Sequence, residues 1–139
     1  MKNAELRMKS GFVFEKEIGY GNPIVTKSLA FGIRIVKFYK ILFTRFKEYD
    51  TIFRQLIRCG TSVGANVSEA QSAISKKDFV NKMQIALKES RETEYWLKLL
   101  IGTEIINSKE YQSLFADCEE LSKLLTSILK SSKYNIENS

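Results

Sequence analysis

Residues 52–70 read IFRQLIRCGTSVGANVSEA, and this stretch decides the fold. Its apolar side chains recur at the spacing of one helix face, at Ile52, Leu56, Val63, Val67 and Ala70. Gly60 and Gly64 lie four residues apart in the same stretch, and a glycine inside a helix costs roughly 1 kcal/mol relative to alanine. We therefore expect the backbone of a neighbouring helix to approach this one closely.

A row of polar side chains follows the same helix beside its apolar stripe, namely Gln55, Arg58, Ser62, Asn66 and Glu69. Amide, guanidinium, hydroxyl and carboxylate groups in this order can satisfy one another's hydrogen bonds, or those of another helix. Three interpretations stay open: a structural network that fixes helix register, a contact between subunits, and a ligand or catalytic site. The third is the weakest, because no histidine or metal ligand joins the row.

Helical periodicity extends outward from this stretch in both directions, and few glycines or prolines interrupt it. We predict helices over residues 26–46 and 51–73, a third that opens at Ser75 and carries a core stripe to Ile101, and a fourth that runs to about Lys130. The expected caps are Thr26, Asp50 or Thr51, Ser75, and Asn107 or Ser108. The third helix buries Phe79, Met83, Ala86, Ser90, Leu97 and Ile101. The first buries a stripe from Phe31 to Phe46, and the fourth a heptad seam from Tyr111 to Ile128.

These helices predict an all-α fold, an antiparallel up-down-up-down four-helix bundle over residues 26–132. Residues 1–25 read as an irregular N-terminal arm, whose Phe12, Val13, Phe14 and Ile18 can dock on another surface. Residues 133–139 are polar and read as a frayed C-terminal tail.

The third predicted helix has a second face that is also unlike a solvated surface. Ile85, Glu89, Trp96 and Leu99 cluster away from the core stripe, with Glu92 among them. A second strip of this kind on a bundle helix predicts a cover. The cover is the fourth helix, the N-terminal arm or a neighbouring subunit.

The composition excludes most enzyme chemistry. The 139 residues contain no histidine, which removes the commonest general base and metal ligand, and we predict no catalytic residue, metal or cofactor. Ser127 and Lys130 have a Ser-x-x-Lys spacing, which arises often by chance. No stretch is apolar enough to cross a membrane and no signal peptide is visible, so we predict a cytoplasmic protein with Cys59 and Cys118 as reduced core residues.

The net charge of +6 is unevenly distributed. Residues 25–50 hold six basic residues against two acidic ones, a surplus of four, and the basic side chains fall largely on one side of the first helix. We identify Lys27, Arg34, Lys37 and Arg45 as a candidate contact for RNA or DNA. The alternative is a solvated face that only keeps the protein soluble.

Three separated motifs resemble one family in order. They are SLAFGIRIV over residues 28–36, RCGTSVGANVSEA over 58–70, and SKKDF over 75–79 followed by KESRETEYWL over 88–97. The sequence over about residues 24–130 resembles the small four-helix-bundle proteins encoded in 23S rRNA intervening sequences. Cys59 stands where that family usually has serine, and Gly32 where it usually has alanine.

The resemblance implies a bundle that forms homopentamers and has no established enzymatic activity. A related group, the accessory variability proteins of diversity-generating retroelements, forms a basic pentameric barrel that binds nucleic acid and a reverse transcriptase. We therefore expect a non-enzymatic oligomeric binding or scaffold protein whose partners are its own copies and RNA or DNA, with no small-molecule substrate. The alternative is a purely structural oligomer, or a protein–protein interaction module, without a nucleic-acid role.

Overall fold

The computed structural model describes the backbone of residues 22–137 and the side chains of residues 22–132. Within these residues there is no strand, and the chain forms four α-helices and a short 3-10 turn. They are α2 (Pro23–Arg45), η1 (Lys47–Tyr49), α3 (Asp50–Ala70), α4 (Lys76–Gly102) and α5 (Ser108–Glu137). This confirms the all-α class and the number of helices. The apolar residues of the predicted arm, Phe12 to Ile18, lie outside the described residues.

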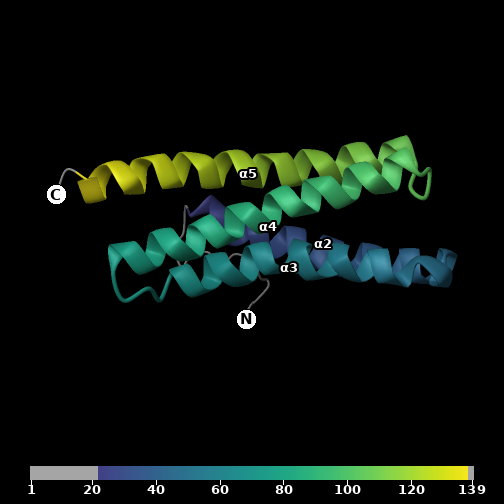
Figure 1. Cartoon of the computed structure of the whole chain (residues 1–139), viewed down its shortest axis with the longest axis horizontal. Helices are drawn as coiled ribbons and strands as arrows, with labels where there is room; N and C mark the ends of the chain where they lie inside the picture. The colour runs from purple at the N-terminus through teal and green to yellow at the C-terminus, as the bar shows by residue number, and fades with distance from the viewer. Residues whose placement is uncertain (1–21, 138–139) are drawn as a thin grey trace.

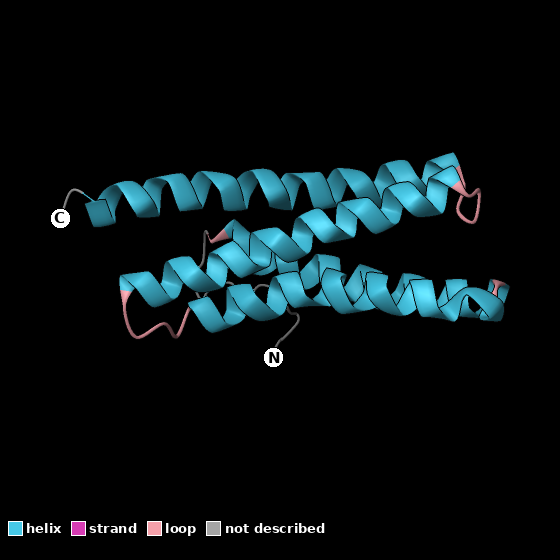
Figure 2. Ribbon diagram, viewed as in Figure 1, coloured by secondary structure: helices cyan, strands magenta, loops and turns pink. Residues whose placement is uncertain are grey.

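The helices pack in the order of the sequence. Helix α2 packs on α3, α3 on α4 and α4 on α5, whereas α2 and α5 approach each other over a shorter stretch. Figure 1 shows the chain returning along its neighbour after each connection. Figure 2 shows that these connections lie at the two ends of an elongated molecule.

The starts of the helices follow from local chemistry, with two differences from our predictions. Helix α2 begins at Pro23, whose missing N–H and fixed φ suit a first turn, so Thr26 is not its cap. Helix α3 begins at Asp50, and its carboxylate accepts hydrogen bonds from Tyr39 and Arg54 instead of capping the helix. Ser75 caps α4 as predicted, since its Oγ accepts the Asp78 N–H at 3.0 Å.

The remaining ends differ by a few residues. Asn107 and Glu110 form the reciprocal hydrogen bonds of a capping box at the start of α5. Helix α3 ends at Ala70 and not at Ala73, while α5 continues to Glu137, beyond the predicted end near Lys130. In the turn between α4 and α5, Glu104 has a φ of 62°, which closes the helix in the left-handed region that usually requires glycine.

The core lies along the shared inner faces of the four helices. Helix α4 is rotated slightly from the predicted stripe, so that Val80 and Leu100 are buried while Phe79 and Ile101 are only partly buried. At the start of α3 the fully buried residue is Phe53 and not the predicted Ile52, which is partly buried. The buried residues of both helices still recur at steps of three and four residues, as in a helix bundle. A small rotation of a helix about its axis therefore only exchanges one core residue for the residue next to it in the sequence.

The contact between α2 and α3 is closest at the two glycines, as the sequence predicted. A Cβ atom at Gly60 would lie 3.0 Å from side-chain carbons of the buried Ile35. A Cβ atom at Gly64 would lie 3.0 Å from the backbone oxygen of Ser28. A backbone carbonyl inside a helix cannot rotate away as a side chain can, so Gly64 sets how closely the two helices approach.

We predict opposite effects for two glycine-to-alanine substitutions at this contact. Gly64→Ala gains helix propensity but drives a methyl group into the Ser28 carbonyl, and we expect a net loss of about 1–2 kcal/mol. Gly32→Ala is the matched control, because its Cβ would meet only the Thr61 Cα atom at 3.9 Å, and we expect it to be neutral or stabilising. Urea unfolding followed by circular dichroism measures both. Equal stability of the two variants would contradict the proposed role of Gly64.

Candidate functional site

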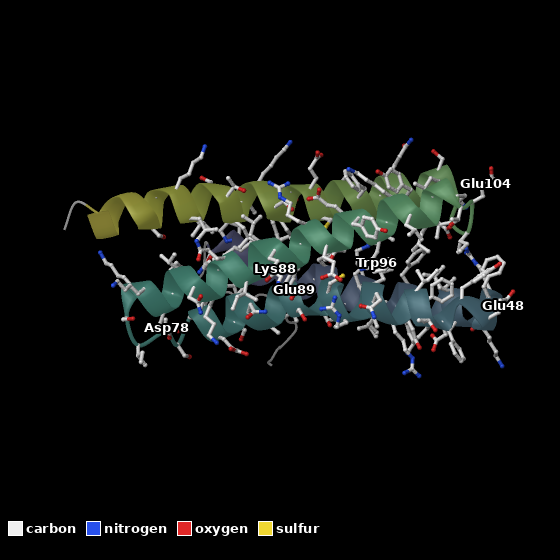
Figure 3. All side chains as sticks on the ribbon, in the orientation of Figure 1. Glu48, Asp78, Lys88, Glu89, Trp96 and Glu104 are labelled. Carbon is white, nitrogen blue, oxygen red and sulfur yellow. The ribbon has the colours of Figure 1, made fainter. Side chains whose placement is uncertain are left out.

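Arg58 is the centre of the predicted polar row. Its guanidinium donates to Glu89 of α4 at 3.2 Å, to Glu92 of α4, and to Gln55 one turn earlier on α3 at 3.3 Å. Figure 3 labels Glu89 and Trp96 on the edge of α4 that faces α3. The Arg58 side chain is 47% exposed, so this group links α3 to α4 at the rim and not inside the core.

Glu92 is the most constrained carboxylate in this group. It accepts a hydrogen bond from the Trp96 indole N–H at 3.0 Å in addition to that from Arg58. The Trp96 hydrogen bond and then the Arg58 guanidinium hold the pKa of Glu92 below its ordinary value. The same Glu92 hydrogen bond raises the pKa of Arg58, so both groups stay charged at neutral pH.

The other members of the row do not join this group. The Ser62 hydroxyl donates to the Arg58 carbonyl at 2.7 Å, and the Asn66 amide donates to the Ser62 carbonyl at 2.9 Å. Glu69 pairs instead with Lys82 of α4 at 2.9 Å. The row therefore does not form one closed network. Arg58 and Glu69 each link α3 to α4 at the rim, whereas Ser62 and Asn66 between them bond to the backbone of their own helix.

The aromatic face of α4 is only partly covered. Trp96 is half-buried and packs against the core. Ile85 and Leu99 are also half-buried. Tyr95 is 56% exposed, and its ring meets that of Trp96 edge-on with centroids 5.0 Å apart. The predicted second face therefore consists of a shielded tryptophan with an exposed tyrosine beside it.

The four basic residues assigned to nucleic acid have a different environment from the one we predicted. Three pair with acidic side chains of α5: Lys27 with Glu120 at 2.7 Å, Arg34 with Asp117 at 2.5 Å, and Arg45 with Glu110 at 2.7 Å. Lys37 is exposed and makes no ion pair with any side chain of residues 22–132. The α5 carboxylates thus neutralise most of the basic face along the seam between α2 and α5.

An apolar groove between α2 and α3 was not predicted. It has a volume of about 810 Å³. One wall is the exposed apolar strip of α2, formed by Leu29, Ile33 and Val36, with 46%, 49% and 38% exposure. The floor consists of small residues of α3, which are Thr61, Gly64, Ala65 and Ser68. The sequence did carry a signal, since Leu29, Ile33 and Val36 follow helical spacing beside the core stripe.

Reactive groups are scarce in the described part of the chain. Cys59 and Cys118 are buried free thiols, as predicted, and burial raises the pKa of Cys59 to about 11 and that of Cys118 to about 12. Thiols of this kind are weak nucleophiles. Residues 22–132 contain no cluster of acidic or thiol side chains suited to a metal ion. The described helices include none with the length and apolar character needed to cross a membrane.

Comparison with known proteins agrees with the sequence motifs. A family model described as "23S rRNA-intervening sequence protein" matches residues 22–127. The chain belongs to this family. The match covers all of α2, α3 and α4 and most of α5, so the glycine contact, the Arg58 group and the groove all lie within the family region.

A solved structure from Bacteroides thetaiotaomicron is similar to this family member over most of its length. It is a protein of unknown function from the S23 ribosomal protein family, determined at 1.70 Å resolution. It shares 51% sequence identity and superposes with a TM-score of 0.75, over 77% of this chain and 98% of that one. No curated protein matches the chain. The comparisons thus establish the family, in which this relative's function is unknown.

We predict that Arg58→Ala weakens the fold in a pH-dependent way. Because the guanidinium is half exposed, we expect a loss of about 1 kcal/mol at neutral pH, well below the cost of breaking a buried network. Glu92 has a lowered pKa when folded, so its contribution is present above its ordinary pKa and disappears as the pH falls through the folded value. The difference between parent and variant should therefore shrink below about pH 4.

Thermal melts of both proteins between pH 7 and pH 3 measure this difference. Arg54→Ala is the matched control, since among residues 22–132 Arg54 pairs only within its own helix, with Asp50. An Arg58→Ala variant that melts like Arg54→Ala at neutral pH would show that the link between α3 and α4 contributes nothing.

Proposed function

We propose that this protein is a non-enzymatic, self-assembling binding module. The observation that carries the proposal is the exposed Tyr95 ring on α4, which lies against the half-buried Trp96 and close in sequence to the Arg58 partner Glu92. Tyrosine, tryptophan and arginine are the residues most enriched at the energetic centres of protein interfaces. Their grouping on one rim of a bundle favours a contact with another protein surface.

Hydrogen bonds within the chain already hold the Trp96 and Arg58 side chains of this rim in place. The Trp96 N–H and three donors of the Arg58 guanidinium already have hydrogen-bond partners within the chain, so a partner surface needs to satisfy fewer polar groups there. The resemblance to the 23S rRNA intervening-sequence proteins supports a ring of five copies. A ring requires two different surfaces on each subunit, because its contacts are head-to-tail.

Contact with RNA or DNA is the second candidate function, and the ion pairs change where it would take place. Charge reversal at Arg34 or Arg45 would place a glutamate beside Asp117 or Glu110 and disturb the α2–α5 seam. Lys37 and Lys40 are exposed and make no ion pair with side chains of residues 22–132. These two lysines, repeated around an oligomer, would supply the phosphate contacts.

We predict that the purified chain forms an oligomer, with a mass near five times 16.0 kDa by light scattering. Tyr95→Lys adds a charge to the proposed interface and should lower the mass, or weaken assembly by at least tenfold in concentration, without unfolding the helices. Ile74→Lys is the control, because it makes the same change at a 94% exposed site in the α3–α4 turn. A stable monomer, or equal behaviour of the two variants, would contradict the assembly through Tyr95.

If nucleic acid is a partner, we expect weak, sequence-independent binding that falls steeply with salt. Lys37→Glu with Lys40→Glu should abolish it in an anisotropy titration at low salt. Lys76→Glu with Lys77→Glu is the matched control, since it makes the same charge change at the start of α4. Equal losses from the two pairs would indicate a general charge effect and no site on α2.

A further inference from the structure

The α2–α3 groove is a surface separate from the Tyr95 face, and the described residues leave its apolar wall open. Three apolar side chains, Leu29, Ile33 and Val36, are each more than one-third exposed along it. The small residues of the α3 floor give the groove its depth, because Gly64 brings the two helices together without filling the space above them. Apolar surface in such a groove favours an occupant.

The two ends of the groove differ in chemistry. At one end the lining includes Gln71, whose side-chain oxygen accepts a hydrogen bond from the Asn22 amide at 3.4 Å. The chain therefore enters α2 directly at this end. At the other end the lining includes Lys37 and Lys40, which make no ion pair within residues 22–132. An occupant that suits the groove is apolar along its length and acidic at the lysine end.

We propose that residues 14–20 of the same chain occupy this groove, running back from Asn22 towards Lys40. This segment reads FEKEIGY and lies outside the described residues. It carries three apolar or aromatic side chains, Phe14, Ile18 and Tyr20, and the acidic residues Glu15 and Glu17 on either side of Lys16. The family region begins only at residue 22, so this cover is built from sequence beyond the common bundle.

The lengths of the segment and the groove agree. From Asn22 to Lys37 the helix rises about 22 Å at about 1.5 Å per residue, and from Asn22 back to Glu15 an extended chain spans about 23 Å at about 3.3 Å per residue. Glu15 therefore reaches the level of Lys37. On the proposed extended path Ile18 would lie about 13 Å from Asn22, close to the level of Leu29 at about 10 Å.

The direct connection to α2 favours this segment over any partner in solution. A short tether holds the segment near the groove at an effective concentration of about millimolar, so modest apolar contacts are enough to keep it bound. Glu15 and Glu17 outweigh Lys16 by one charge, so the segment brings a small opposite charge to the two basic side chains at the lysine end. The groove would then be closed in each subunit, while the Tyr95 face remains available for assembly.

A disulfide test on the full chain locates the segment. We expect Ile18→Cys with Leu29→Cys to form an intramolecular disulfide under mild oxidation, seen as a faster-migrating monomer band on a non-reducing gel. Ile18→Cys with Tyr95→Cys is the control pair and should not form one. The native Cys59 and Cys118 are buried, so they do not compete. Labelling of a single Ile33→Cys by a maleimide should also be several-fold faster when Phe14→Ser and Ile18→Ser are introduced.

Three results would overturn the proposal. The first is cross-linking of the Ile18–Leu29 pair no faster than that of the control pair. The second is a cross-link between two chains, which would assign the groove to a neighbouring copy. The third is Ile33→Cys labelling that is unchanged by the two serine substitutions. None of these depends on the mass of the oligomer, so the outcome is separate from that of the proposed assembly.

Discussion

The contact of α2 with α3 at Gly64 is the constraint on which the rest of the structure depends. The Ser28 carbonyl lies in the space that a Cβ atom at Gly64 would need, and Ile35 packs directly against Gly60. A rotation or separation of the two helices would therefore break this packing. This geometry turns the small residues of α3 outward beside the apolar strip of α2. The same feature that holds the first two helices together thus also creates the groove on their outer side.

Charge in this bundle is arranged in pairs between helices. The basic residues of α2 meet acidic residues of α5 along a seam where the backbones come together only briefly, and Arg58 and Lys82 link α3 to α4 at the opposite rim. Long, partly exposed side chains of this kind add little stability individually. Their effect is to fix which helix faces lie together and to leave only some lysines available to an external polyanion.

The described part of the chain exposes few reactive groups. Its thiols are buried with raised pKa values, and buried hydroxyls such as Ser90 and Ser122 are hydrogen-bonded to each other. Its exposed apolar side chains include those along the α2–α3 groove and Tyr95. Under the two proposals above, a second copy would cover the Tyr95 face and the N-terminal segment would cover the groove.

The sequence alone determined the helical class, the family motifs, the buried thiols and the close approach at the glycines, because each depends on local spacing or on the cost of a single residue type. It did not determine that Phe53 and not Ile52 fills the core, since one step of helix rotation decides this. It also did not show that Arg58 pairs with α4, or that α5 neutralises Arg34. Those partners lie 31 to 83 residues away in the chain, and only the packing of the helices brings them together.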